Sequence, residues 1–220
     1  MRSLIYWSDA LNSTDTHSTH PTRRRVIKVG GSLFSDPNTP NLLRQWLDAH
    51  DDKQNILIGG GGTLVDSIRQ WESEGKLNTE EAHWMAIQCM TLTADLLKHW
   101  LNVPLLCQPS HIAHTPNNPV VVMDVHNWLR QESDMPVGWS LTSDSIAAAL
   151  ADRLQAEELI LLKPCSPPSG TTALRTLSDA GYVDRLFCQY GERIESVGFV
   201  DFLSPTPDIL FLSTLGSAVS

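Results

Sequence analysis

Short apolar runs alternate with segments of helical periodicity along most of this chain. The apolar runs predict buried strands at residues 26–29, 55–58, 105–108, 120–123, 159–162 and 196–200. Apolar residues three and four positions apart predict helices at about residues 41–50, 63–74, 80–101, 125–131, 143–155 and 173–180. Because the strands are apolar on both faces and alternate with helices, the pattern predicts an α/β fold. We expect a three-layer αβα sandwich with a mainly parallel open sheet.

The two ends of the chain lack this pattern. Residues 1–24 are rich in Ser, Thr and His and contain no signal-peptide apolar segment, which predicts a flexible leader. The folded domain is expected to span residues 25–204. Residues 205–220 are partly apolar but carry Pro205 and Pro207, so we assign them to a C-terminal tail and predict no element there.

Composition and charge narrow the class of protein. The chain has 220 residues, of which 41% are hydrophobic and 19% are charged, as in ordinary globular proteins. Its formal net charge of -9 argues against a nucleic-acid or anionic-membrane partner, because such binding depends on Lys and Arg. No apolar run reaches the roughly 18 residues of a membrane-spanning helix. The four cysteines are far apart and form no CxxC pair, so we expect reduced thiols, a cytoplasmic protein and no protein-held metal.

Two glycine clusters follow the first two predicted strands, at Gly30-Gly31-Ser32 and at Gly59 to Gly62. Ligands of open α/β sheets bind beyond the carboxyl ends of the strands. Glycine lets successive N–H groups turn inward around an anion, and a following helix adds its positive end. The pair of turns therefore predicts a site for a donor phosphate and an acceptor group. The alternative is that they are only tight turns. Neither matches a Walker A loop or GxGxxG, which disfavours a dinucleotide-dependent oxidoreductase.

Two charged residues stand out beside these turns. Lys28 lies inside a buried strand, where an ammonium is costly unless it reaches a site or a partner. Two residues before a Gly-Gly turn, it would point toward a bound polyphosphate; the alternative is an edge-strand lysine that reaches water. Asp144 lies in the first turn of a predicted helix. One interpretation is that Asp144 only complements the helix dipole, and its position in the sequence alone favours this interpretation. The alternative is that its carboxylate orients lysines or magnesium at the phosphates.

Three segments together carry a resemblance to the amino acid kinase family. They are Val26-Ile27-Lys28-Val29-Gly30-Gly31-Ser32, Ile56-Leu57-Ile58-Gly59-Gly60-Gly61-Gly62 and Leu141-Thr142-Ser143-Asp144-Ser145-Ile146-Ala147-Ala148-Ala149-Leu150-Ala151. They stand in the order of the family and span about residues 25–165. The resemblance implies an ATP-dependent kinase, with magnesium, that phosphorylates a small molecule.

The resemblance also implies a role for each matching residue. Catalytic roles fall to Lys28, which stabilises the phosphoryl group, and Asp144, which organises the lysines. The ATP phosphates are implied to lie on Gly30, Gly31 and Ser32, and the acceptor on Gly60 and Gly61. Lys163 is implied as a second ATP-side lysine, with a solvated strand end as the alternative. Larger members carry a Thr-Asp-Val-Asp-Gly-type segment and a lysine hairpin next, whereas this chain continues Pro164-Cys165-Ser166, which leaves nucleotide preference open.

The acceptor is suggested by the run Glu81-Ala82-His83-Trp84-Met85-Ala86. It resembles compact archaeal-type members that phosphorylate an aminomethylfuran-type monophosphate, and it implies His83 as an acceptor ligand; a structural histidine is the alternative. Asp66 is a candidate partner for the acceptor's ammonium, or else a solvated acid. The alternatives are an amino-acid or nucleoside-monophosphate kinase, or a nucleotide-binding sensor or storage protein without turnover. The family also implies a possible homo-oligomer.

Overall fold

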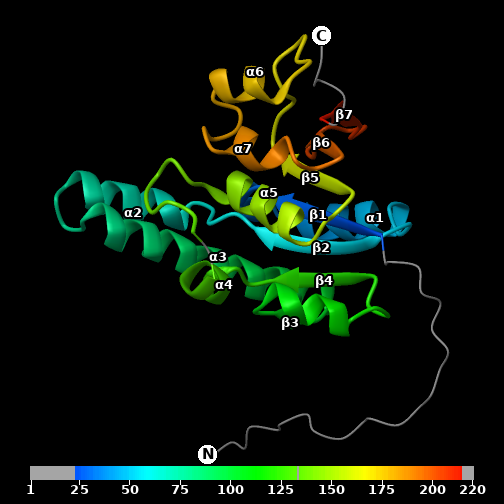
Figure 1. Ribbon diagram of the computed structural model, residues 1–220, viewed down its shortest axis with the longest axis horizontal. Coiled ribbons are helices and arrows are strands. Elements are labelled where there is room, and N and C mark those ends of the chain that lie inside the picture. The colour runs from blue at the N-terminus through cyan, green and yellow to red at the C-terminus, as the bar shows by residue number, and fades with distance from the viewer. Residues whose placement is uncertain (1–22, 133, 215–220) are drawn as a thin grey trace, which may run out of the picture.

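The computed structural model describes residues 23–132 and 134–214 and has a single seven-stranded sheet at its centre (Figure 1). Its strands are β1 (Arg24–Val29), β2 (Gln54–Gly59), β3 (Leu105–Leu106), β4 (Val120–Met123), β5 (Glu158–Lys163), β6 (Ser196–Asp201) and β7 (Ile209–Ser213). Their order is β3-β4-β2-β1-β5-β6-β7, and every neighbouring pair is parallel except β6 and β7. The predicted α/β fold with a mainly parallel sheet is confirmed.

Helices cover both faces of this sheet. They are α1 (Thr39–Ala49), α2 (Leu64–Ser73), α3 (Thr79–Leu101), α4 (His126–Glu132), α5 (Ser143–Arg153), α6 (Leu174–Asp179) and α7 (Phe187–Gly191), with short 3-10 helices at η1 (Gly31–Ser35) and η2 (Pro109–His114). One core packs α4, α5 and α7 against the sheet, and a second core packs α1 and the later turns of α3 against the other face. The helix α2 and the first turns of α3 form a hairpin that extends past the sheet (Figure 1).

The strand β1 shows how the alternation of side chains fixes the site. Val26 belongs to the core under α5, while Ile27 and Val29 belong to the core under α1. Because successive side chains of a strand point to opposite faces, Lys28 lies on the α5 face. Lys28 is a buried charged residue two positions before Gly30, where the first glycine turn begins.

Differences from the sequence prediction lie mainly near the C-terminus. All predicted strands and helices are present within a few residues of their expected bounds, although β3 is shorter than expected. Residues 209–213, within the segment assigned to a tail, form the antiparallel edge strand β7. The structure also adds α7, η1 and η2, which are too short to give a clear period.

Most of the predicted leader lies outside the described residues, and the domain bounds stay a prediction. No helix among the described residues is long and apolar enough to cross a membrane.

Candidate active site

The two glycine turns touch each other, backbone against backbone. The strands β1, β2 and β5 are parallel neighbours, so their carboxyl ends lie side by side. A Cβ atom added to Gly31 would lie 2.5 Å from the backbone nitrogen of Gly62, which is too close for any other residue. The glycines are thus required for this contact, and Gly62 itself has φ of +66°.

Hydrogen bonds decide which amides of these turns are free for a ligand. The N–H of Gly30 donates to the carbonyl of Leu162, and the N–H of Gly60 donates to that of Val29, each at 2.9 Å. Both amides are therefore used by the sheet, and Gly30 contributes room rather than a donor. Gly31 and Ser32 line the cavity described below, together with Gly60 to Gly62. A short 3-10 helix, η1, follows the first turn and precedes α1.

A buried carboxylate joins two buried lysines beside the turns. Asp144 Oδ1 lies 2.8 Å from Lys28 Nζ, and Asp144 Oδ2 lies 2.8 Å from Lys163 Nζ. The exposed fractions of the three side chains are 8%, 7% and 12% in the order Asp144, Lys28 and Lys163. Two ammonium groups and one carboxylate leave an excess of one positive charge. A buried excess charge of this kind favours an anion as a further partner.

The protonation states of these groups follow from their surroundings. Burial alone would raise the pKa of the Asp144 carboxyl, but the ammonium groups of Lys28 and Lys163 outweigh it and hold that pKa below its usual range. Burial lowers the pKa of Lys163 below the ordinary lysine value, and its attraction to Asp144 opposes this only in part. Asp144 is therefore a carboxylate at neutral pH, with both oxygens already held by cations.

Asp184, which the sequence did not suggest, holds the start of α5 in place. Its Oδ2 accepts hydrogen bonds from the N–H and hydroxyl of Thr142 and from the N–H of Ser145. Its Oδ1 accepts from the Ser145 hydroxyl and from the N–H of Leu186. The same segment supplies the carbonyl of Tyr182, which accepts a hydrogen bond from Lys163. One short stretch of chain thus fixes the helix turn that carries Asp144 and also contacts Lys163.

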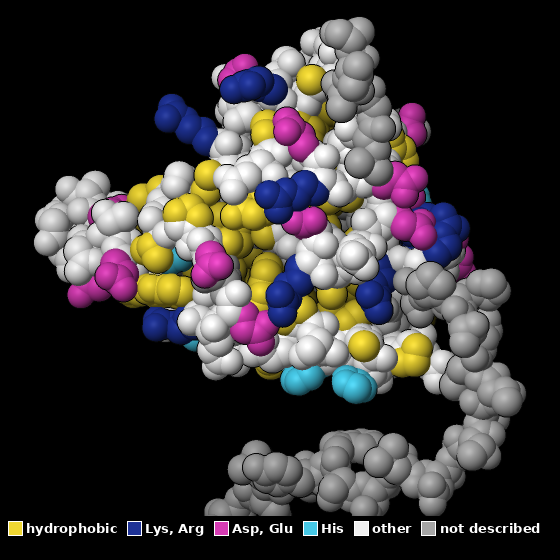
Figure 2. Space-filling model, in the orientation of Figure 1, with side chains coloured by type: hydrophobic (Ala, Val, Ile, Leu, Met, Phe, Trp, Pro, Cys, Tyr) yellow, Lys and Arg dark blue, Asp and Glu magenta, His cyan; other side chains and the backbone are white. Residues whose placement is uncertain are grey.

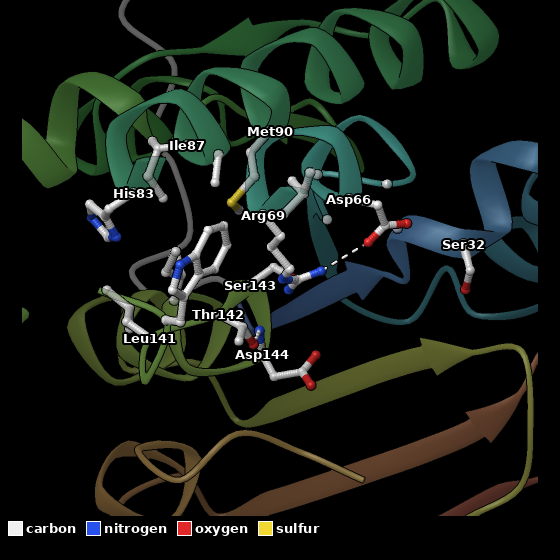
Figure 3. Close-up of a pocket in the computed structure, with 18 of the residues that line it drawn as sticks. Ser32, Asp66, Arg69, His83, Ile87, Met90, Leu141, Thr142, Ser143 and Asp144 are labelled. Atoms are coloured by element: carbon white, nitrogen blue, oxygen red, sulfur yellow. Dashed lines mark hydrogen bonds and ion pairs between the residues drawn. The ribbon is translucent and has the colours of Figure 1, made fainter. Parts of the chain in front are cut away.

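A cavity of about 340 Å³ opens between the two turns, the α2–α3 hairpin and the start of α5. Lys28, Ser32 and Asp144 line its polar end. Ile87, Met90 and Leu141 line the other end, and Figure 3 shows Ser32 and His83 at opposite sides of the view. The volume lies at the lower end of the range for small-molecule sites, so the cavity suits a compact ligand.

His83 lines the apolar end of this cavity, and part of its ring is already engaged. Its Nδ1 accepts a hydrogen bond from the N–H of Gly138 at 3.3 Å. Burial lowers the pKa of the His83 imidazole, with a smaller opposing effect from Gly138 and Glu80. The neutral ring therefore carries its hydrogen on Nε2, which leaves that nitrogen as a donor. His83 thus lines the same cavity as the glycine turns, and its role as an acceptor ligand stays a prediction.

A second hollow, of about 400 Å³, lies at the carboxyl ends of β5 and β6. The loop from Ser166 to Thr171 lines this hollow together with Asp201 and Asp208. The Ser166 hydroxyl donates to Asp201 at 2.9 Å, which ties the loop to β6. Since β5 lies beside β1, this hollow and the first glycine turn share the same edge of the sheet.

Charged side chains are scattered over the visible face of the molecule (Figure 2). Acidic and basic groups are interspersed there. Ion pairs near the surface of the protein include Arg153 with Glu132 and Arg193 with Asp152. Lys and Arg side chains therefore form no broad basic patch on this one face. The excess positive charge described above is buried, at the two lysines beside Asp144.

The fold and this site define a class of protein: a parallel αβα sandwich with a buried cationic centre at two glycine turns. The family model described as "Amino acid kinase family" matches residues 23–164. The chain belongs to this family, and it is a small-molecule kinase.

Solved structures of similar fold agree with this family. UMP kinase from Ureaplasma parvum is 16% identical with a TM-score of 0.65, and the match covers 88% of this chain and 100% of that chain. UMP kinase from Bacillus anthracis is 12% identical with a TM-score of 0.65, covering 89% and 97%. Uridylate kinase from Archaeoglobus fulgidus is 18% identical with a TM-score of 0.55, covering 80% and 88%. At these identities the likeness concerns the fold. A sequence search of curated proteins gave no match.

Proposed function

We propose that this chain transfers the γ-phosphoryl group of ATP to a small-molecule monophosphate, with an aminomethylfuran-type monophosphate as the best candidate acceptor. The observation that carries the proposal is the buried cluster of Lys28, Asp144 and Lys163 beside the two touching glycine turns. Its excess positive charge stands where donor and acceptor phosphates would meet. Electrostatic stabilisation of this kind is the main means of catalysing phosphoryl transfer.

The reaction requires little covalent chemistry from the protein. An oxygen of the acceptor phosphate attacks the γ-phosphorus, the bond from that phosphorus to the β,γ-bridging oxygen breaks, and ADP leaves with the electron pair. The attacking oxygen is already anionic, so no general base is needed. Lys28 neutralises the charge on the transferring group, and Lys163 does so on the donor side. Asp144 keeps the two ammonium groups apart and in position, and Asp184 positions Asp144.

Magnesium fits this site through the nucleotide rather than through the protein. Each oxygen of Asp144 already faces a lysine at 2.8 Å, so a metal ion at this carboxylate would compete with two ammonium groups. When bound, Mg²⁺ would neutralise negative charge on the phosphates of ATP. The cavity amides of Gly31 and Ser32 would hold the same phosphates. Gly60 and Gly61 would approach the acceptor.

The nucleoside of ATP is assigned to the hollow beside β5 and β6. This hollow lies along the sheet edge from the first glycine turn, so a nucleotide placed there would direct its phosphates toward Gly31. Asp201 and Asp208 supply acceptors for ribose hydroxyls. The wall from Ser166 to Thr171 replaces the segment found in larger family members. Nucleotide preference therefore depends on this loop.

The compact cavity supports a small acceptor. Its volume and its apolar end suit a single ring with a phosphate, and Asp66 lines the wall where an ammonium would need a carboxylate. A nucleoside monophosphate is the runner-up, and an amino-acid-type carboxylate is the third candidate. His83 could donate from Nε2 to any of these.

An ATP-consumption screen tests the proposal. Acceptors would be furan and isoprenoid monophosphates, nucleoside monophosphates and amino acids. With a furan monophosphate as acceptor, we expect release of ADP and formation of the corresponding diphosphate. We also expect the KM for furan monophosphates to be lower than that for the other acceptor classes. Binding of ATP without turnover of any acceptor would support a sensor or storage protein instead. Whether the chain forms homo-oligomers stays a prediction, and light scattering of the purified protein would measure it.

A further inference from the structure

An arginine and a tryptophan face each other at the wall of the cavity, and phosphoryl transfer as described above uses neither. The guanidinium carbon of Arg69, on α2, lies 4.8 Å from the ring centre of Trp139. Arg69 Nη1 also lies 3.0 Å from Asp66 Oδ1, one helical turn earlier. All three side chains line the cavity, and Figure 3 shows Arg69 reaching toward Asp66 between the polar and apolar ends.

We propose that Arg69 and Trp139 form the binding subsite for the acceptor, and that this subsite selects a phosphomonoester with a flat, unsaturated ring. Arg69 exchanges its contact with Asp66 for the phosphate of the acceptor, and the ring lies against the indole of Trp139. The inference rests on the proposed function because it concerns the same cavity, but ligand binding alone can test it.

The exchange of Asp66 for a phosphate is energetically easy. The side chains of Arg69 and Asp66 are 52% and 68% exposed, and an exposed ion pair of this spacing contributes little to stability. A phosphate offers the guanidinium two parallel charge-assisted hydrogen bonds and more negative charge than one carboxylate. Arg69 is therefore held near its working position in the free protein and can release Asp66 when an acceptor arrives.

Trp139 is held as a fixed platform by two contacts of its loop. Its indole Nε1 donates a hydrogen bond to Glu72, one turn beyond Arg69 on α2. The preceding residue, Gly138, has φ of +130°, which only glycine adopts readily, and its N–H donates to Nδ1 of His83. His83 thus positions the tryptophan loop through one ring nitrogen. A preorganised aromatic surface binds a ring at low entropic cost.

The shape and charge of the remaining wall agree with a flat ring. Ile87 and Met90 on α3 face the same cavity as Trp139, together with Leu141 and Ile146. A ring between the indole and these apolar side chains would place its phosphate toward Arg69 and the second glycine turn. Stacking on an aromatic face adds to simple burial for a flat ring, and a saturated ring cannot gain it.

Calorimetry with two matched probes tests the subsite directly. The probes are benzyl phosphate and cyclohexylmethyl phosphate, which differ in the flatness of the ring. We expect the full chain to bind benzyl phosphate several-fold more tightly. Arg69→Gln should weaken both probes by about tenfold or more. Trp139→Leu should abolish the preference for benzyl phosphate, whereas Trp139→Phe should retain it.

The effect of Asp66→Asn on phosphate affinity tests whether Arg69 exchanges Asp66 for the phosphate. Asp66→Asn removes the competitor for Arg69, so both phosphates should bind about two- to fivefold more tightly. The matched control is Arg130→Gln, since Arg130 also lies over a tryptophan, 4.3 Å from the ring centre of Trp84, on a helix that does not carry the cavity wall. It should leave both affinities unchanged, and thermal melting would check that every variant is folded.

The outcomes separate this inference from the proposed function. Dependence of binding on Arg69 and Trp139, without turnover of any acceptor, would support the subsite and overturn the kinase proposal. Turnover that does not change when Arg69 or Trp139 is substituted would support the kinase proposal and overturn the subsite. Failure of the wild type to bind either probe overturns the subsite, as does weaker phosphate binding in Asp66→Asn.

Discussion

Lys163 and Asp144 form a buried ion pair in which Lys163 Nζ lies 2.8 Å from Asp144 Oδ2, on the oxygen opposite to the one that faces Lys28. The lysine ends β5 and the carboxylate begins α5, 19 residues earlier in the chain. This pairing shows that Lys163 is part of the buried centre rather than a solvated strand end. A second lysine thus reaches the site without the hairpin that larger family members carry.

Removal of Lys28 should affect turnover much more than folding. Lys28→Ala leaves Asp144 paired with Lys163, which is a neutral combination, so the fold should persist. Turnover should fall by at least about 10²-fold, because a preorganised charge at the transferring group is lost. Steady-state ADP release measures the effect. Lys76→Ala is the control, since Lys76 is 64% exposed and lies far along the α2–α3 hairpin. A near-normal rate in Lys28→Ala would remove Lys28 from catalysis.

Neutralisation of Asp144 should strongly destabilise the protein. Asp144→Asn leaves two buried ammonium groups without a counter-charge, and loss of one partner of such a pair costs about 3–5 kcal/mol. Since the folded pKa of Asp144 lies below its ordinary value, its contribution is present at neutral pH and is lost as the pH falls through that folded pKa. Urea unfolding at neutral pH measures the loss. The double variant Lys28→Met/Asp144→Asn should recover part of it, and no recovery would contradict this account.

Lys163 should set the alkaline limb of the pH profile. Burial lowers its pKa below the ordinary lysine value of about 10.4, so kcat/KM should decline at a pH below that value as the ammonium loses its proton. Over the same interval the unfolded chain binds more protons than the folded one, so stability should rise with pH while activity falls. In Lys163→Arg the side chain stays charged at high pH. The activity that remains in this variant should therefore decline only at a higher pH than in the wild type. An unchanged limb would assign the titration to another group.

Asp184 should act on kcat through the position of α5. Asp184→Asn keeps one acceptor oxygen but replaces the other with a donor that faces the N–H and hydroxyl groups of Thr142 and Ser145. We expect a stability loss of about 1–3 kcal/mol and a fall in kcat with little change in the KM for ATP. Asp152→Asn, which disturbs only a surface pair with Arg193, is the control. Equal effects on kcat and KM, or none on kcat, would limit Asp184 to a structural role.

The order of elements and the two glycine turns could be predicted because their signals are local. Apolar runs and helical spacing predict the bounds of β1, β2, α3 and α5 to within two residues, and a lysine two positions before Gly30 is visible in the sequence alone. The antiparallel β7 was missed because an edge strand with three exposed residues in five lacks a buried pattern. Its preceding prolines also favour a loop.

The sequence by itself determined that two glycine turns and a buried lysine lie at the ends of parallel strands, since strand alternation and glycine geometry are properties of the local chain. Only the tertiary structure decided which side chains meet there. Lys163 reaches Asp144 because β5 is the neighbour of β1, and Asp184 reaches Thr142 across 42 residues. Such contacts depend on strand order and on how the loops close over the sheet edge, and no local periodicity encodes either of them.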